Sequence, residues 1–444
     1  MLRKLSHFLT LGLTLATTLG QGQSDLRIPA NDDGLPGTGP LRRYEWFQNL
    51  WLEKRQGWAK QVQADQDALV FYGDSITQGW GDIGKAFPGI KCANRGISGD
   101  TTRGLLVRLQ GDVLSLNPKG VVLLIGTNDL EENAEPPVIA SNMKLLIAGL
   151  KKHNAKMPIV LCQVFPSSAS KARPAEKIIQ VNKLYQKVVQ GDPQVTVIDT
   201  WTLFASDTGD AKKGEFPDLL HPNEKGYAKW AAALHPILAT LDFTDTEPDT
   251  FALEPDFTSL FNGRDLTGWS YLPTTKKMKT QAANWKKTDP NAPPWPIVEQ
   301  KAIFDGKTTT PDGRYMAKNG RLIVTTPPEG RKIQQLWTTK DYSGNFTLKL
   351  EFRATPNADS GVFLKGKQLQ CRDFLLAGPY TELKAFRPLK WNELIVRANG
   401  NRATCTVNGE IIEDNFQIPE SGPFGLEGDR GQVDYRRLRI KAEN

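Results

Sequence analysis

Four short segments of this sequence carry residue types that suit acyl transfer. Gly73-Asp74-Ser75 comes directly after an apolar run, and Asp218 stands three residues before His221. An Asp at this spacing can accept a hydrogen bond from Nδ1–H of the ring, which leaves Nε2 to take a proton from a serine. Between them, Gly96 offers a backbone N–H and Asn128 a side-chain amide. The set predicts a serine nucleophile, a base and two donors for an oxyanion.

Each segment alone also fits a purely structural role. Asp and Ser are common helix caps, and Gly and Asn are common in turns. The chain has only four histidines, and none after residue 235, so few residues could act as the base. His153 adjoins two lysines at a predicted helix end, and His235 lies off the apolar face of the last predicted helix. Only His221 has an acidic partner at useful spacing, so we expect it to be the base.

The surrounding pattern predicts a parallel sheet with these segments at one edge. Five apolar runs are typical of strands: 68–72, 92–97, 120–126, 158–165 and 195–199. Stretches with helical periodicity lie between and after them: 101–116, 136–153, 175–190 and 223–241. Such alternation gives a parallel sheet with right-handed crossovers, and ligands bind beyond the carboxyl ends of its strands.

The four segments, in this order, resemble the SGNH (GDSL-type) hydrolase family. The flanking text FYGDSITQGW, NRGISGDTTRGLLVRL and VVLLIGTNDL is most similar to the branch with the platelet-activating-factor acetylhydrolase catalytic subunits. Over about 43–241 the resemblance implies a flavodoxin-like three-layer α/β/α sandwich and ester hydrolysis without a metal or other cofactor. It implies Ser75 as nucleophile, His221 and Asp218 as its partners, and Gly96 and Asn128 as oxyanion donors.

The second half reads as a different domain. Residues 242–256 are acidic and contain two prolines, which is typical of a linker. Residues 271–313 read as Lys- and Pro-rich loops. Alternating runs at 346–353, 361–365, 393–396 and 402–407 then predict strands. Asn408-Gly409 predicts a type I′ hairpin turn. This half therefore predicts a mostly-β sandwich.

Several motifs in this half resemble the 3-keto-disaccharide hydrolase-like domain, a concanavalin-type jelly roll. They include FNGRDLTGW, LWTT, DSGVFL and GPFGL, and the resemblance spans roughly 257–444. Gln368 stands where that family usually has a Glu, whereas Gln370 and Asp373 fit the pattern. Gln cannot act as a general acid or base, so a binding or packing module is favoured over a glycosidase. The aromatic residues that could stack on sugars are Trp285, Trp295 and Trp337.

Charge and composition exclude other classes. Residues 1–20 have two basic residues, an apolar stretch and a small-residue cleavage site, which predicts a secretory signal peptide. No Cys precedes Cys92, so we expect no lipid anchor. The apolar stretch is far shorter than the roughly 20 residues that span a bilayer, so we expect no membrane span. The formal charge of +7 is spread along the chain, which argues against a nucleic-acid partner. The cysteines show no CxxC spacing, and only Cys371 and Cys405 could pair within the second half.

The sequence as a whole predicts a secreted or periplasmic serine esterase. We expect it to remove short acyl groups, above all acetyl, from carbohydrate or another small ester, with the β domain holding the glycan. Two alternatives remain open. One is a lipid-type acylhydrolase or thioesterase, and the other is a glycan-binding or glycoside-cleaving protein centred on the β domain. Protein partners are not indicated.

Overall fold

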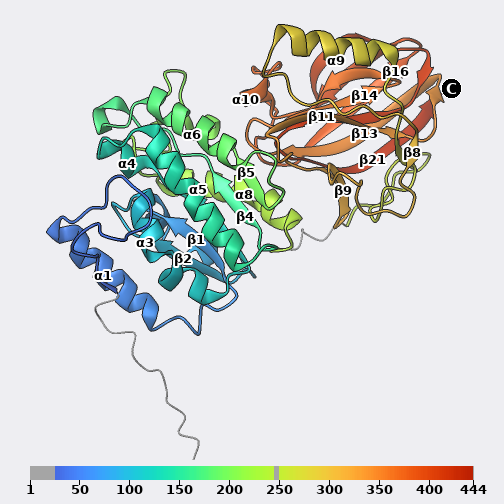
Figure 1. The fold of residues 1–444 in the computed structure, drawn as a ribbon. Coiled ribbons are helices and arrows are strands. Elements are labelled where there is room, and N and C mark those ends of the chain that lie inside the picture. The colour runs from blue at the N-terminus through green and yellow to red at the C-terminus, as the bar shows by residue number, and fades with distance from the viewer. Residues whose placement is uncertain (1–25, 245–249, 444) are drawn as a thin grey trace, which may run out of the picture.

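The computed structural model describes residues 26–244 and 250–443, which form an α/β part and a β part (Figure 1). The predicted signal peptide at 1–20 lies outside the described residues. The α/β part is built on a sheet of five parallel strands in the order β2-β1-β3-β4-β5. The strands are β1 (Leu69–Gly73), β2 (Cys92–Gly96), β3 (Gly120–Leu124), β4 (Ile159–Cys162) and β5 (Val195–Ile198). This is the flavodoxin-like order that the sequence predicts.

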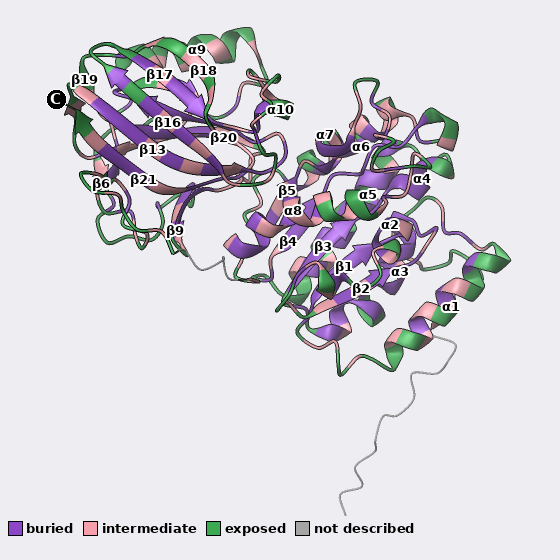
Figure 2. Ribbon diagram, turned by 180° about the vertical axis from the view of Figure 1, so that it is seen from behind, coloured by how far each residue is buried: buried purple, intermediate pink, exposed green. Residues whose placement is uncertain are grey.

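Helices cover both faces of this sheet, which explains why its central strands read as continuous apolar runs. Val70 and Tyr72 face one layer, whereas Leu69 and Phe71 face the other. The first layer contains α3 (Thr102–Asp112), α5 (Pro136–His153) and α6 (Ala175–Val189). The second contains α2 (Ser75–Gly79), α7 (Thr200–Phe204) and α8 (Glu224–Thr240). The predicted three-layer α/β/α sandwich is confirmed, and Figure 2 shows its buried strands between the helices.

A helix that the sequence analysis did not predict, α1 (Glu45–Ala59), packs outside α3. Its buried residues Phe47, Trp51 and Arg55 recur every four positions and so form one face. The Trp51 indole donates to the carbonyl oxygen of Leu26 at 3.0 Å. The Gly- and Pro-rich segment before α1 is thereby held against the domain. The remaining short helices of this part are α4 (Thr127–Glu131), η2 (Ile83–Lys85), η3 (Leu114–Leu116) and η4 (Ala169–Lys171).

The β part is a sandwich of two antiparallel sheets. The larger sheet has the order β18-β17-β16-β13-β21-β10-β9, with β6 paired to β21. Its strands are β6 (Thr258–Ser259), β9 (Tyr315–Lys318), β10 (Arg321–Val324), β13 (Asn345–Ala354), β16 (Asn392–Asn399), β17 (Arg402–Val407), β18 (Glu410–Gln417) and β21 (Val433–Glu443). The smaller sheet has the order β15-β14-β20-β11-β7-β8. Its strands are β7 (Trp269–Tyr271), β8 (Ala302–Ile303), β11 (Arg331–Thr338), β14 (Asp359–Leu364), β15 (Lys367–Gln370) and β20 (Gly425–Arg430).

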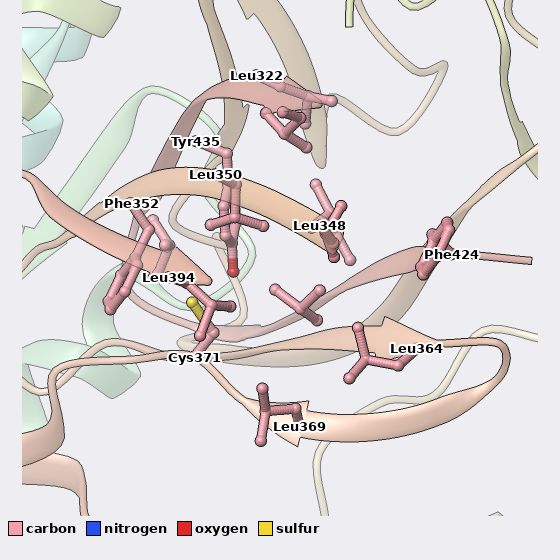
Figure 3. Packing of buried hydrophobic residues seen from close by; sticks show 14 of the residues in the cluster. Leu322, Leu348, Leu350, Phe352, Leu364, Leu369, Cys371, Leu394, Phe424 and Tyr435 are labelled. Carbon is pink, nitrogen blue, oxygen red and sulfur yellow. The ribbon is translucent and has the colours of Figure 1, made fainter. Parts of the chain in front are cut away.

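The core of the sandwich lies between the inner faces of these sheets (Figure 3). Leu348, Leu350 and Phe352 alternate along β13 and point into it, as the predicted period-two pattern requires. Cys371 and Cys405 are buried in this core as free thiols, so the disulfide considered above is absent from this structure.

Turns and connections of the β part agree with the prediction in one place and correct it in another. Asn408 and Gly409 have φ of 50° and 87°, as a type I′ turn requires. Within the predicted loops at 271–313, however, the structure has a helix, α9 (Lys276–Thr288), so that interpretation was wrong for these residues. None of the 13 residues of α9, all of them described, is buried, so it lacks the apolar stripe that reveals a helix in sequence. The remaining elements are α10 (Phe374–Ala377) and the pair β12 (Tyr342–Ser343) and β19 (Ser421–Gly422).

Direct contacts join the two parts. Gln432 Nε2 donates to the Pro236 carbonyl oxygen and to Thr240 Oγ1 in α8, both at 3.0 Å. Asn357 Nδ2 donates to Asp199 Oδ2 at 2.8 Å, beyond the end of β5. Leu376 of α10 also packs against the apolar cluster of the α/β part. The β part is therefore docked on one side of the α/β part as well as tethered to it.

The segment predicted as a linker at 242–256 is described except for 245–249. At one end Phe243 packs against the core of the α/β part. At the other end the Glu254 carboxylate pairs with Arg439 of β21. Among the helices of the described residues, none has the length and apolar character needed to cross a membrane.

Candidate active site

Ser75, His221 and Asp218 lie in one hydrogen-bonded row at the carboxyl edge of the parallel sheet. Ser75 is the first residue of α2, directly beyond β1. His221 Nε2 lies 3.0 Å from Ser75 Oγ, and His221 Nδ1 lies 2.7 Å from Asp218 Oδ2. A ring held in this way can accept the serine proton at Nε2 while the carboxylate faces Nδ1–H.

The loop that carries the ring is shaped by Asp218 itself. Asp218 Oδ1 accepts the backbone N–H groups of Leu220 at 3.0 Å and His221 at 2.7 Å. Leu219, between Asp218 and Leu220, has φ of 63°, and its carbonyl oxygen accepts a hydrogen bond from the Ser167 hydroxyl. Partial burial opposes ionisation of Asp218, but the hydrogen bonds from His221 and Leu220 lower its pKa to about 2. The Asp218 carboxylate is therefore ionised at any pH well above about 2.

Gly96 ends β2 at a position where only glycine fits. A Cβ there would lie 2.2 Å from the Gln78 nitrogen and 2.7 Å from the Asp74 carbonyl oxygen. This close approach brings the backbone of Gly96 against α2. The Gly96 N–H donates to Asn94 Oδ1 at 3.0 Å, so it must share or leave this acceptor to reach a substrate oxygen. Sequence reasoning had no means of detecting this partner.

Asn128 lies in α4, next to the end of β3. Its Nδ2 donates to the Asp100 carbonyl oxygen at 2.9 Å, and its Oδ1 accepts from Arg173 at 2.9 Å. Within the described residues, the second N–H of the Asn128 amide has no acceptor. Its carboxamide is buried beside the same strand edge, so one side-chain N–H remains for a ligand.

Beneath these residues, the buried Arg108 side chain joins the ends of two strands. Its guanidinium donates to the carbonyl oxygens of Gly73 at 3.0 Å and Arg95 at 2.9 Å. It also pairs with Asp100 at 2.7 Å and lies 4.5 Å from the centre of the Tyr72 ring. Sequence analysis missed this residue, although it stands two helical turns after Asp100 in the segment quoted for Gly96.

Three buried carboxyl groups surround this edge. Burial raises the pKa of Asp74 to about 7, with a smaller contribution from the charge of Asp100. Burial likewise raises the pKa values of Asp100 and Asp129 to about 6 each, although hydrogen bonds from Arg108 and Thr102 oppose this. Asp74 Oδ1 caps α2 through the Ile76 N–H at 2.9 Å, whereas its Oδ2 has no partner among the described residues.

Comparison with known families assigns both parts of the chain. Residues 71–229 match the family model of the GDSL-like Lipase/Acylhydrolase family, and residues 256–441 match that of the 3-keto-alpha-glucoside-1,2-lyase-like domain. The chain carries a GDSL-like acylhydrolase domain followed by a 3-keto-disaccharide hydrolase-like domain. The family matched by residues 71–229 is one of lipases and acylhydrolases, which supports hydrolase activity on esters.

The curated relatives described here match up to half of the chain. The alpha1 subunit of platelet-activating factor acetylhydrolase IB from Rattus norvegicus is 27% identical over 229 residues, which cover 50% of this chain and 92% of that protein. The alpha2 subunit from Homo sapiens is 26% identical over 208 residues, with 45% and 89% covered. A solved structure, a GDSL-like lipase from Bacteroides thetaiotaomicron, is 23% identical, with 42% of this chain and 97% of that chain covered and a TM-score of 0.38.

A second candidate site is a cavity of about 450 Å³ in the 3-keto-disaccharide hydrolase-like domain. It lies over the smaller sheet and beside α9, and it brings together the three tryptophans singled out in the sequence: Trp285, Trp295 and Trp337. Arg331 extends over the Trp285 ring while it binds Asp429 through two hydrogen bonds of 2.8 and 2.6 Å. This contact connects α9 with the strands below.

The same cavity contains carboxyl groups that the sequence analysis did not nominate. They are Asp359, Glu427 and Asp429, and alternation along β20 places Glu427 and Asp429 on the same face. Burial, assisted by the charges of Asp429 and Asp359, raises the pKa of Glu427 to about 8. Gln368 donates to Glu427 and lines the cavity with Gln370. Asp373 lies elsewhere, where it accepts the Asn357 N–H at 3.0 Å.

We predict that Asp74→Asn stabilises the protein at pH 8 by about 4 kcal/mol and has little effect at pH 4. The pKa of Asp74 is higher in the folded protein than in the unfolded chain, so its contribution worsens as the pH rises from about 4 through 7. Asn keeps the cap to Ile76 without ionising. Urea unfolding of both proteins at pH 4, 6 and 8 measures this difference.

Asp82→Asn, at an exposed cap that accepts the Gly84 N–H, serves as the matched control. An identical pH dependence for wild type and Asp74→Asn would contradict the prediction.

Proposed function

We propose that this chain is an exported serine esterase that removes short acyl groups, above all acetyl, from carbohydrate without a metal. The observation that carries the chemistry is the His221 ring between Ser75 Oγ at 3.0 Å and Asp218 Oδ2 at 2.7 Å. Export rests on the predicted signal peptide at 1–20, which lies outside the described residues.

In the proposed mechanism, Ser75 Oγ attacks the ester carbonyl carbon while His221 Nε2 takes the hydroxyl proton. Asp218 holds Nδ1–H and stabilises the imidazolium. The N–H groups of Ser75, Gly96 and Asn128 donate to the oxyanion, and Gly96 first gives up or shares Asn94 Oδ1. His221 then protonates the departing alcohol, which leaves an acyl-serine. Water, deprotonated by His221, attacks this ester and releases the carboxylic acid and Ser75.

Acetyl is the acyl group that the relatives support, because the two curated relatives described above are named acetylhydrolases. Carbohydrate as the alcohol part rests on the aromatic cavity of the second domain, since tryptophan rings suit the C–H faces of sugars. A lipid-type acylhydrolase is the competing assignment, because the named acetylhydrolases act on platelet-activating factor.

Exposed aromatic rings beside the catalytic edge also favour a carbohydrate. Tyr44 and Trp46 are each 52% exposed and stack with their rings 9° from parallel. A Cβ at Gly99, three residues after Gly96, would lie 2.6 Å from the Trp46 ring, so the pair borders this loop. The Glu132 carboxylate lies next to it and accepts a hydrogen bond from the Tyr44 hydroxyl at 3.3 Å. Flat rings beside such a group are suited to a sugar ring with its hydroxyls.

Replacing Ser75 by Ala is expected to lower kcat for p-nitrophenyl acetate by at least about a thousandfold, because the nucleophile is lost. Nitrophenolate release by the full chain measures this. Ser141→Ala removes an exposed hydroxyl from α5 and should leave the rate unchanged. Activity that survives in Ser75→Ala would refute the serine mechanism.

Replacing Trp285 by Ala should slow acetate release from an acetylated plant polysaccharide by roughly tenfold while p-nitrophenyl acetate turnover stays constant. The expected loss corresponds to one sugar-stacking face, on the order of 1 kcal/mol. Trp391→Ala is the control, because that ring lies outside the cavity beneath Arg436. An equal loss of polysaccharide activity in both variants, or no loss in either, would contradict a glycan-binding role for the cavity.

The raised pKa of Glu427 favours a second candidate function, glycoside cleavage in the same cavity, because a protonated carboxyl can donate to a leaving oxygen. If the cavity only binds, Glu427→Gln should retain glycan affinity within about threefold near pH 7, since the side chain is neutral in both proteins. Isothermal calorimetry measures the affinity. Sugar release by wild type that disappears in Glu427→Gln, and persists in Ser75→Ala, would instead establish the cleaving function.

A further inference from the structure

A buried arginine that belongs to none of the four segments holds the amide of Asn128. Arg173 is 2% exposed and stands between η4 and α6. Ala172 before it has φ of 56°, and the Arg173 backbone N–H donates to the Ser168 carbonyl oxygen at 3.1 Å. The tight turn directs the side chain inward, toward the N-terminus of α4.

The guanidinium of Arg173 binds three acceptors on α4. Nε donates to the Thr127 carbonyl oxygen at 3.1 Å. One terminal nitrogen donates to Asn128 Oδ1 at 2.9 Å and to Glu131 Oε2 at 2.7 Å. Two of these contacts fall on neighbouring residues of the same short helix, so the side chain fixes both the backbone before Asn128 and its amide.

This contact determines which way the Asn128 amide faces. A guanidinium has hydrogen-bond donors only, so it donates to the carboxamide oxygen and repels the NH₂ group. With Oδ1 facing Arg173, Nδ2 must face the opposite side, where it donates to the Asp100 carbonyl oxygen. A flipped amide would lose both hydrogen bonds and bring two sets of donors together.

The positive charge of Arg173 also polarises the amide that it touches. A cation at the carboxamide oxygen draws electron density from Nδ2 and makes its N–H groups stronger donors. Glu131 limits the net charge nearby, because its carboxylate lies between Arg173 and Arg42. Burial would raise the pKa of Glu131, but both arginines together lower it, so the carboxylate stays ionised.

We infer that Arg173 is a positioning residue for ester hydrolysis: it locks and polarises the Asn128 amide so that one N–H is presented to the oxyanion. This inference rests on the proposed function, in which Asn128 is an oxyanion donor. Arg173 touches no reacting atom and acts through Asn128 alone. Its loss should therefore lower the rate of the chemical step and leave ground-state binding unchanged.

The test is a double-mutant cycle on p-nitrophenyl acetate with the full chain. Asn128→Ala should lower kcat about a hundredfold. Arg173→Met should lower kcat about tenfold with KM within about twofold, and it should have no further effect in the Asn128→Ala background. Arg173→Lys, which keeps the charge but not the forked geometry, should recover part of the loss.

Arg42→Met provides the matched control for stability. Arg42 is also buried and paired with Glu131, yet it has no contact with Asn128. The midpoint temperature of thermal unfolding should fall by a similar amount in both variants, whereas kcat should fall only in Arg173→Met. Each variant keeps one arginine beside Glu131, so the buried part of that carboxylate retains a partner.

Three results would overturn the inference while Ser75 remains the nucleophile. The first is an equal loss of kcat in Arg42→Met and Arg173→Met. The second is the same loss of kcat from Arg173→Met in the wild-type and in the Asn128→Ala background. The third is full activity in Asn128→Ala alongside an inactive Ser75→Ala, which would also remove Asn128 from the oxyanion site. Full activity in Ser75→Ala would instead refute the proposed function itself.

Discussion

The edge of the sheet that carries the candidate site depends on one buried cation, the guanidinium of Arg108. It binds carbonyl oxygens at the ends of two neighbouring strands, at Gly73 and Arg95, and Ser75 and Gly96 of the candidate site follow shortly after them. A buried charge is costly unless it is paired, and Asp100 supplies the pair on the loop after Gly96. The same ion pair therefore joins two strand ends to the loop beside them. Nearby, the Asp100 backbone carbonyl accepts from Asn128, which extends this network to the third strand.

Most of the α/β part could be predicted because its signals are local. Apolar runs such as that of β3 are buried on both faces, and the helices between them carry one apolar side each. Parallel topology then brings the carboxyl ends together, so segments separated by 146 residues, at Ser75 and His221, meet across 3.0 Å. The sandwich was equally visible from alternation in strands such as β13 and from the Asn408-Gly409 turn.

What sequence reasoning missed depends on side-chain contacts and burial that no periodicity in the sequence encodes. Helix α9 contains no buried residue, and Arg331 with Asp429 holds its Trp285 from elsewhere in the fold. The partner of the Gly96 N–H is a side chain two residues away, whose rotamer no periodicity encodes. Glu427 was overlooked for a related reason. Its altered pKa arises from burial and from Asp359, which sheet pairing brings near it.

The docked junction between the domains has a consequence for how a polymer would be used. Gln432 binds the carbonyl of Pro236, and Asn357 binds Asp199, so the domains meet through specific hydrogen bonds beside their short connection. Two sites on a flexible tether sample many separations, and the tether sets their effective concentration. Two sites across a closed junction have one separation, set by the fold. If a sugar chain occupies the aromatic cavity, only esters at a matching number of residues along it come to Ser75. The fixed separation of the two sites would then determine which substituent along the glycan is removed.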